Sequence, residues 1–207
     1  YIHVGRPRPL YRALRLEKFL GLNKVKIFYK REDLSPTGSH KLNTALAQAY
    51  FAYKEGKNTL VTETGAGQWG TALSYAARML DLNCIVFWVK NVYEWKIQRR
   101  TLMKLYGAKV YPSPSRETEI GKKYLEKDPN HPGSLSIAIS EGLETASKLE
   151  NAVYSLGSVL NHVLLHQTII GLEALEQFKK IDSMPNLIIS CLGGVSNFGG
   201  IALPFIR

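Results

Sequence analysis

The sequence predicts an α/β fold, in which parallel, twisted sheets are covered by helices on both faces. Apolar runs of strand length alternate with stretches of helical period along almost the whole chain. Three glycine-containing loops each lie between a strand-like run and a helix-like stretch. This alternation is typical of a mainly parallel sheet, because each crossover helix covers one face of the sheet.

The expected elements follow one another in a regular order. Strands are expected at residues 25–29, 59–62, 84–89, 109–111 and 187–191. Amphipathic helices are expected at residues 43–54, 71–80, 97–106, 118–126 and 162–180. Residues 112–115 and 128–133 are rich in Pro, Ser or Asn and are predicted to be loops. Ligands of such folds bind at the carboxyl ends of strands, so the loops that follow strands are where a site is expected.

The composition is that of a soluble globular protein. The chain has 207 residues, of which 45% are hydrophobic and 21% charged, enough for one substantial core or for one large and one small domain. The longest apolar stretches are of strand length, far short of a membrane span, and the opening residues do not resemble a targeting segment. Cys84 and Cys191 lie in apolar runs, which is typical of buried thiols in a reducing compartment. We therefore expect a cytoplasmic protein with no membrane partner.

The formal net charge of +10 comes from basic residues that are scattered along the whole length. Proteins that bind single-stranded nucleic acid combine a basic groove with aromatic side chains, and this sequence has no such stripe. We therefore expect no nucleic-acid partner. The charge is interpreted as a lysine-rich exterior that modestly favours anionic ligands.

The first loop, residues 31–43, places a lysine where a helix begins. Pro36 and Gly38 favour a turn, and Ser39 is suited to cap a helix that starts near Lys41. The helix dipole and burial both disfavour an ammonium ion there, which favours the neutral amine that forms a Schiff base. Composition alone also allows an ordinary exposed lysine at a helix start.

The second loop, residues 62–70, contains Gly65, Gly67 and Gly70 between a strand and a helix. This Gly-x-Gly-x-x-Gly pattern also occurs in dinucleotide sites, where backbone amides bind pyrophosphate. Glu63 directly precedes the glycines and would repel a pyrophosphate. A carboxylate there better suits proton transfer or charge balance in a pocket for a small substrate.

The third loop, residues 193–200, combines glycines, a hydroxyl group and the start of an expected helix. These are the ingredients of a phosphate-binding loop. The alternative is a flexible turn between a strand and a helix.

His162 and His166 lie four residues apart on one helical face, as metal-binding pairs do. No glutamate stands beside the first histidine, so a zinc protease would lack its general base. We expect structural histidines and no metal.

In their order along the chain, the three loops resemble those of the tryptophan synthase beta chain. The resemblance is carried by Ser-Pro-Thr-Gly-Ser-His-Lys-x-Asn at 35–43, Glu-Thr-Gly-Ala-Gly-Gln at 63–68 and Gly-Gly-x-Ser-Asn at 193–197. Gln-Trp-Gly at 68–70 and Leu-Gly-Ser-Val-Leu-Asn-His at 156–162 resemble the divergent second group of these chains. Similarity extends over essentially the whole sequence and includes Gly-Arg-Pro-x-Pro-Leu-Tyr at 5–11. The implied fold is that of the fold-type-II pyridoxal-phosphate enzymes, truncated at both ends.

The resemblance implies a role for each matching residue. Lys41 holds pyridoxal 5'-phosphate and, once L-serine displaces it, removes the α-proton of the substrate. Glu63 assists the departure of the serine hydroxyl and the activation of indole. The substrate carboxylate is bound through the backbone amides of Thr64, Gly65, Ala66, Gly67 and Gln68. The cofactor is further held by His40, Asn43, Gln68, Ser158, Gly193, Gly194, Ser196 and Asn197.

Two residues depart from the main pattern of the family. Val195 stands where a third glycine of the phosphate loop is expected. A β-branched residue there costs about 1–2 kcal/mol if the position needs a left-handed backbone. Trp69 stands where the main group has histidine, but it fits the divergent second group.

The implied protein is a lyase of tryptophan biosynthesis that joins L-serine and indole by β-replacement. Its main cofactor-binding domain is expected at residues 1–56 and 158–207, with a smaller mobile domain inserted at 57–157. The expected partners are a second copy in a homodimer and a tryptophan synthase alpha chain. The alternatives are a serine or threonine deaminase that uses the same dehydrated intermediate, and a non-catalytic remnant of the fold. Tyr1 and Arg207 are expected to be cuts through a longer chain, whose later part supplies the partner of the pyridine nitrogen.

Overall fold

The computed structural model describes residues 4–206, which form two compact units. The first unit contains the residues up to His40 and from Ser158 onward, and the second contains Lys41–Gly157. The predicted domains, with a boundary near residue 57, stay a prediction. The second unit differs from the predicted inserted domain because it includes α2 (Leu42–Lys54), which packs on α3 (Gln68–Met79).

The second unit is built on a parallel sheet with the strand order β5-β4-β3-β6. Its strands are β3 (Thr59–Thr64), β4 (Asn83–Val89), β5 (Lys109–Ser113) and β6 (Ala152–Tyr154). β3 pairs with β4 on one side and, through Val61 opposite Tyr154, with β6 on the other. The chain order along the sheet therefore reverses between β3 and β6. A reversal of this kind leaves a crevice at the carboxyl ends of the two strands.

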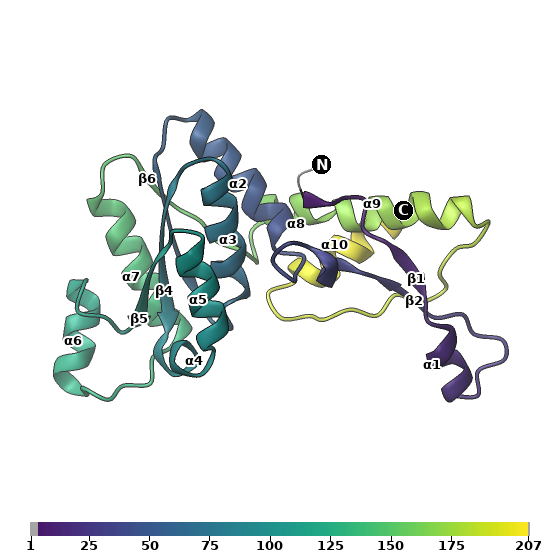
Figure 1. The fold of residues 1–207 in the computed structure, drawn as a ribbon, viewed down its shortest axis with the longest axis horizontal. Coiled ribbons are helices and arrows are strands. Elements are labelled where there is room, and N and C mark those ends of the chain that lie inside the picture. Colours follow the sequence, from purple (N-terminus) through teal and green to yellow (C-terminus); the bar gives the residue numbers. More distant parts are fainter. Residues whose placement is uncertain (1–3, 207) are drawn as a thin grey trace. The chain divides into compact units, whose positions relative to one another are not determined.

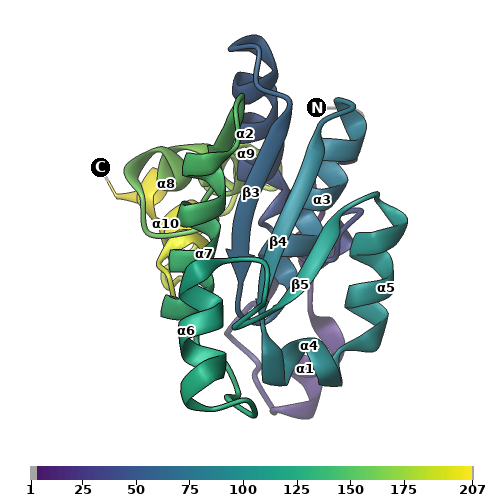
Figure 2. The same cartoon turned by 90° about the vertical axis from the view of Figure 1, so that its left-hand side faces the viewer.

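Helices cover both faces of this sheet (Figure 1, Figure 2). On one face α3 and α5 (Ile97–Leu105) contact the strands, and on the other face α7 (Leu135–Lys148) does. α6 (Glu119–Lys127) packs on α7, and α4 (Lys90–Trp95) follows β4 directly. A cluster of Val61, Phe87 and Ala138 forms the core between the sheet and α7. The predicted α/β class, with a parallel sheet between helices, is confirmed here.

Three elements of the second unit, α4, α7 and β6, have no counterpart among the predicted helices and strands. The first residues of α7 alternate apolar and polar side chains, Leu-Ser-Ile-Ala-Ile-Ser, which obscures the helical period. Ser134 caps this helix by accepting a hydrogen bond from the amide of Ile137. β6 has three residues, too few for a period to show. The residues 112–115 predicted as a loop begin inside a strand, because β5 continues to Ser113.

The first unit contains a two-stranded antiparallel ribbon and several helices. β1 (Leu10–Arg12) pairs with β2 (Phe28–Lys30), and α1 (Leu14–Phe19) follows β1. The helices of the second segment are α8 (Asn161–Gln167), α9 (Ile169–Lys180) and α10 (Ser196–Ala202), with 3₁₀ turns at Glu32–Leu34 and Leu203–Phe205. The single helix predicted at 162–180 is broken at Thr168, whose hydroxyl donates to the carbonyl of Leu165 at 2.6 Å. No helix within residues 4–206 has the length and apolar character to cross a bilayer.

The prediction of a strand at residues 187–191 is wrong. Within residues 4–206 this segment pairs with no strand, and the side chains of Leu187 and Ile189 are 75% and 85% exposed. An apolar run becomes a strand only where a neighbouring strand accepts its hydrogen bonds. Cys191 is consequently exposed, contrary to expectation, whereas Cys84 is buried as expected. The strand predicted at 25–29 is replaced by β2, which runs antiparallel to β1 rather than in a parallel sheet.

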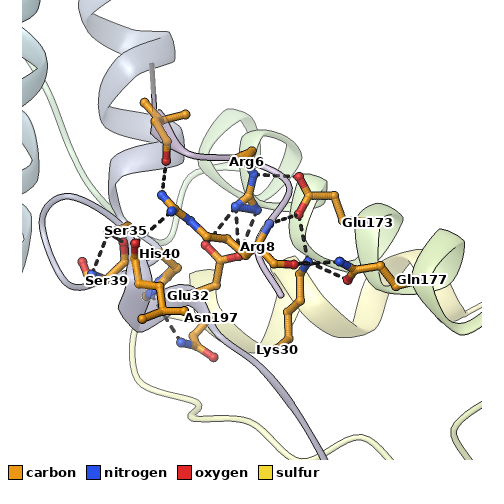
Figure 3. Close-up of polar contacts among 12 residues, drawn as sticks. Arg6, Arg8, Lys30, Glu32, Ser35, Ser39, His40, Glu173, Gln177 and Asn197 are labelled. Carbon is orange, nitrogen blue, oxygen red and sulfur yellow. Dashed lines mark hydrogen bonds and ion pairs between the residues drawn. The ribbon is translucent and has the colours of Figure 1, made fainter. Parts of the chain in front are cut away.

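A cluster of buried charges ties the first unit together (Figure 3). Arg6 pairs with Glu32 at 2.9 Å and with Glu173 of α9 at 3.0 Å, and Lys30 pairs with Glu173 at 2.9 Å. Arg8 donates to the carbonyl of Leu34 at 2.8 Å. Burial lowers the pKa of Lys30, although its bond to Glu173 opposes that effect. The cluster therefore anchors β2 and the segment that leads to Ser35.

Candidate active site

Lys41 stands directly before α2 in the second unit. Its carbonyl accepts from the amide of Ala45 at 3.1 Å, so the helical hydrogen bonding begins at the lysine. Its half-buried amine donates to the carbonyl of Gly157 at 3.3 Å. Burial lowers the pKa of Lys41, while the negative charge of Glu63 acts in the opposite direction. An amine in this setting gives up its proton more readily than a lysine in water, as nucleophilic attack on a carbonyl requires.

The turn that precedes Lys41 belongs to the first unit and is closed by Ser35. The Ser35 hydroxyl donates to the carbonyl of Ser39 at 2.7 Å and accepts from the amide of Ser39 at 3.0 Å. Gly38 has a φ of +71°, which a glycine adopts without strain. Ser39 does not cap α2 as expected: its hydroxyl is buried and has no hydrogen-bond partner in the described part of the chain. The turn therefore brings a polar atom into the interior and leaves it unsatisfied.

Glu63 lies near the carboxyl end of β3 and is 5% exposed. Tyr154 of β6 donates a hydrogen bond to its Oε2 atom. Burial raises the pKa of Glu63, and the hydrogen bond from Tyr154 and the charge of Lys41 oppose this rise. A carboxyl group with a raised pKa holds a proton more readily than an exposed glutamate, which favours a role in acid–base catalysis.

The loop after β3 presents backbone donors at the start of α3. Gly67 precedes the helix with a φ of +90°. A Cβ atom on Gly67 would lie 2.5 Å from the Trp88 ring, so only glycine fits. The Trp88 indole donates to the carbonyl of Gly65 at 2.8 Å and holds the loop against the sheet. Among residues 4–206 the amides of Gly65, Ala66 and Gly67 have no acceptor, which makes this helix start suited to bind an anion.

The segment after β6 lies beside this loop within the second unit. Thr62 donates to the carbonyl of Ser155 at 2.5 Å and accepts from the Trp69 indole at 2.7 Å. A Cβ atom on Gly157 would lie 2.2 Å from the Trp69 ring. Trp69, the departure from the main group of the family, is thus the side chain on which Gly157 packs. The ends of β3 and β6 therefore meet where the strand order reverses, the position at which α/β folds bind ligands.

His40, Ser196 and Asn197 are joined in the first unit. The Nε2 atom of His40 lies 3.1 Å from the Ser196 hydroxyl, and the Asn197 amide donates to Nδ1 at 3.3 Å. Because Nδ1 accepts, Nε2 carries the proton and donates to Ser196. The Asn197 side chain is held in turn by a hydrogen bond from Ser190. Ser196 keeps its own hydroxyl proton for another acceptor.

The loop before α10 packs on Ser158. A Cβ atom on Gly194 would lie 2.6 Å from the Cβ and Oγ atoms of Ser158, so this position requires glycine. Val195 has a φ of +64°, in the left-handed region, which is the conformation suspected from the departure at this position. In the described part of the chain the amides of Gly193, Gly194 and Val195 have no acceptor. Three adjacent free amides before a helix form an anion-binding loop.

The structure collects the predicted residues in two sets, one in each unit. The second unit holds Lys41, Glu63 and the loop Thr64–Gln68, with Asn43 half-buried in the first turn of α2. The first unit holds His40, Ser158, Gly193, Gly194, Ser196 and Asn197. The assigned roles of these residues stay predictions.

The contributions of Tyr154, Trp88 and Trp69 were not predicted from the sequence. No signal near Tyr154 marked a strand, and the indole hydrogen bonds of Trp88 and Trp69 depend on partners that their local sequence does not reveal. His162 and His166 contact each other, with ring centroids 5.8 Å apart. Residues 4–206 contain no group of three or more His, Cys, Asp or Glu side chains placed to hold a metal ion.

Three kinds of comparison relate the chain to known proteins. The family model described as "Pyridoxal-phosphate dependent enzyme" matches residues 3–207. The chain is 58% identical over 207 residues to tryptophan synthase beta chain 2 of Pyrococcus abyssi, of which it covers 47%, and 58% identical to that of Methanothermobacter thermautotrophicus, of which it covers 48%. The chain therefore spans about half the length of these curated relatives.

Among solved structures, the chain is similar to a fungal L-serine ammonia-lyase from Rhizomucor miehei. The TM-score is 0.71 at 23% identity, with 95% of this chain and 54% of that chain covered. A threonine deaminase from T.th. gives a TM-score of 0.62 at 22% identity, with 94% and 52% covered. At these identities the likeness shows the fold alone.

Proposed function

Because the chain belongs to the family of pyridoxal-phosphate dependent enzymes, we propose that it binds pyridoxal phosphate at Lys41 and serves the synthesis of L-tryptophan from L-serine and indole. The identity of 58% over the whole chain to tryptophan synthase beta chains supports this choice of reaction. Taken by itself, the first unit has donors suited to a phosphate in the loop 193–197, and the second unit by itself has an amine at Lys41 and an acid–base group at Glu63. The two sets are neighbours in sequence, since His40 precedes Lys41 and Gly157 precedes Ser158.

The residues present fit the cofactor. A phosphate monoester needs several donors that point to one place, and the free amides of the loop 193–195 with the Ser196 hydroxyl provide them. An aldehyde needs an amine that is not locked in an ion pair. Lys41 meets this need because it donates to a carbonyl oxygen at 3.3 Å and makes no salt bridge in the described part of the chain.

Each residue has a defined task in the proposed reaction. The bound cofactor supplies an electron sink for the charge left when a proton leaves the α-carbon of the substrate. Lys41, with its lowered pKa, carries that proton on its Nζ atom. Glu63, with its raised pKa, gives a proton to the departing serine hydroxyl and later accepts one from indole. The amides of Gly65, Ala66 and Gly67 orient the substrate carboxylate at the start of α3.

The observation that carries this proposal is the half-buried amine of Lys41, which donates to the Gly157 carbonyl and whose pKa is lowered by burial against the opposing charge of Glu63 in the same unit. The test adds pyridoxal phosphate to the purified chain, reduces it with borohydride and maps the modified peptide. We expect the covalent adduct on Lys41 and none in Lys41→Ala. Lys54→Ala, an exposed lysine at the other end of α2, is the matched control and should keep the adduct. An adduct that persists in Lys41→Ala would assign the cofactor to another lysine, and the lack of any adduct would favour a non-catalytic remnant.

A serine or threonine deaminase is the second candidate, because the ammonia-lyase and deaminase structures share the fold. Both reactions begin with the loss of the serine hydroxyl group. They differ in whether indole or water then reacts with the dehydrated serine. The whole protein that carries this chain should be given L-serine with and without indole. Tryptophan as the main product supports the first reaction, and pyruvate that forms regardless of indole supports the second. The identity of 58% against 23% favours the first.

The assembly and the location complete the proposal. We expect a homodimer that also binds a tryptophan synthase alpha chain, as the name of the relatives suggests by its reference to a beta chain. A cytoplasmic location is supported by two free cysteines, one of them buried. Both stay predictions, and light scattering of the whole protein with and without the alpha chain tests the first.

A further inference from the structure

Tyr154 reaches Glu63 because of the register of the sheet. β6 runs parallel to β3 with Tyr154 opposite Val61. Val61 and Glu63 are two residues apart in one strand, so their side chains lie on the same face. A long aromatic side chain spans the distance to a diagonal neighbour two positions along the adjacent strand. The pairing of β6 with β3, rather than a flexible loop, therefore places the phenol of Tyr154 next to Glu63.

The ring of Tyr154 is held in place from the side of α7. A Cβ atom on Gly142 of α7 would lie 2.9 Å from Cε2 of the ring and 3.4 Å from Cδ2. The helix therefore offers no side chain at this point, and the ring packs directly on its backbone. Replacing Tyr154 with phenylalanine keeps this packing and removes only the hydroxyl group.

Tyr154 is the principal donor to the carboxyl group of Glu63. Thr62 also lies 3.5 Å from the Oε2 atom of Glu63. However, its single hydroxyl proton is directed to the carbonyl of Ser155 at 2.5 Å. Within residues 4–206 no side-chain donor is directed at the Oε1 atom of Glu63, and a backbone hydrogen bond to the carboxyl group comes from Glu63 itself. The two carboxyl oxygens are thus unequal, because Oε2 accepts from a phenol and Oε1 accepts from no side chain.

We propose that Tyr154 is a positioning residue for the proton transfers of Glu63. By donating to Oε2, it fixes the plane of the carboxyl group and leaves Oε1 as the atom that gives and receives the proton. The catalytic meaning of this arrangement rests on the proposed function, but the hydrogen bond and its effect on the titration of Glu63 do not.

The electrostatics agree with this assignment. Burial, and then the charge of Glu63, raise the pKa of Tyr154, so the phenol stays protonated and remains a donor. The Tyr154 hydrogen bond opposes the rise in the pKa of Glu63 that burial causes. Without the phenol the charged carboxylate loses a donor, and the pKa of Glu63 rises further.

Apart from Lys41, the titratable groups named below lie on elements around Glu63 but make their contacts with other residues. Glu141 of α7 accepts from the hydroxyls of Ser115 and Thr118, each at 2.7 Å. Glu144 of α7 pairs with Lys148. On α3, Arg78 pairs with Asp81, and the Tyr75 ring contacts Tyr106. Cys84 of β4 is buried, which raises its pKa to about 12.

The test follows the titration of Glu63 by carbon-13 NMR of labelled glutamate in the purified chain without cofactor. Glu63→Gln identifies the resonance by its loss. In Tyr154→Phe we expect the pKa of Glu63 to rise by about 1–2, since a hydrogen bond to a charged group contributes about 1.5–3 kcal/mol. Tyr111→Phe is the matched control. Tyr111 stacks on Phe87 in the same sheet, and its hydroxyl makes no bond to Glu63. This variant should leave the titration unchanged.

A second measurement needs no variant at Tyr154. In the unmodified chain the phenolic carbon of one tyrosine should shift with the same midpoint as the Glu63 carboxyl, and this response should vanish in Glu63→Gln. An unchanged Glu63 titration in folded Tyr154→Phe overturns the proposal, as does the lack of any tyrosine that follows the Glu63 midpoint. Both readouts are independent of cofactor binding, so failure here is distinct from failure of the proposed function.

Discussion

The amide of Val159 donates a hydrogen bond to the carbonyl of Gly194 at 3.0 Å. This bond holds two unusual turns of the first unit side by side. In each turn the residue after a valine donates its amide to the carbonyl of the residue before that valine. Leu160 donates to Ser158 and Ser196 donates to Gly194, both at 2.8 Å. Val159 and Val195 have φ values of +72° and +64°. Turns of this kind with a positive φ are rare and strained, and a β-branched residue is ill suited to them.

Val195→Gly should therefore tighten the binding of pyridoxal phosphate. Relief of the left-handed valine, worth about 1–2 kcal/mol, and the freedom that glycine adds to the unfolded chain, about 0.4–1 kcal/mol, act on the free energy of unfolding. Binding should gain because the substitution removes a side chain that crowds a phosphate at the free amides of residues 193–195. We expect several-fold stronger binding in a cofactor titration of the purified chain. Val159→Gly is the control, because it relieves similar strain without removing a side chain from the loop 193–197. Weaker or unchanged binding in Val195→Gly alone would show that the valine does not hinder the phosphate.

Glu63→Ala should retain the cofactor and slow tryptophan formation. General acid–base groups contribute about 10²–10⁴-fold in rate, and the loss should fall in this range for the whole protein. Glu55→Ala, at an exposed residue, is the control and should leave turnover unchanged. The measurements are the cofactor spectrum and the rate of tryptophan formation. A variant that keeps most of the turnover would make Glu63 a structural residue.

Glu173→Ala should destabilise the chain strongly, because Glu173 neutralises Arg6 and Lys30 in the buried cluster (Figure 3). Removing one partner of a buried ion pair costs about 3–5 kcal/mol, since it leaves an uncompensated charge. Glu176→Ala, on the same helix but in an exposed pair with Lys179, should change the free energy of unfolding by less than about 1 kcal/mol. Urea denaturation measures both. Equal effects of the two substitutions would contradict the importance of the buried cluster.

Glu144 should make the stability of the second unit depend on acid pH. Burial acts to raise its pKa, but the hydrogen bonds from Lys148 and from the amides of Ile120 and Glu119 outweigh it and hold the pKa at about 2, against an ordinary value of 4.5. Because the folded value is depressed, the stabilisation is complete above pH 4.5 and is lost as pH falls to about 2.

The variant Glu144→Gln tests this dependence. At neutral pH it should lower the free energy of unfolding by about 0.5–2 kcal/mol, the usual worth of a side chain that caps a helix. The difference from the unmodified chain should shrink as pH falls from 4.5 toward 2. Glu126→Gln, at an exposed residue of α6, is the control. A difference that stays constant over this range would assign the effect to packing rather than to charge.

The sequence alone predicted the features that depend on neighbouring residues. β3, β4 and β5 overlap the predicted strands, and α2, α3, α5 and α6 overlap the predicted helices. Strand and helix periods and turn residues act over a few positions, so they can be recognised in one sequence. The three loops were found for the same reason, since each combines glycine, a polar group and a helix start within a short segment.

The tertiary structure decided which distant residues meet. Tyr154 and Glu63 are 91 residues apart, and His40 and Ser196 are 156 apart, so no local pattern reports either contact. The tertiary structure also decided that residues 187–191 form no strand. Their apolar pattern suits a strand, but they pair with no strand within residues 4–206. A strand, a buried charge or a shared proton depends on a partner that the fold brings near. The preferences of the local residues do not supply that partner.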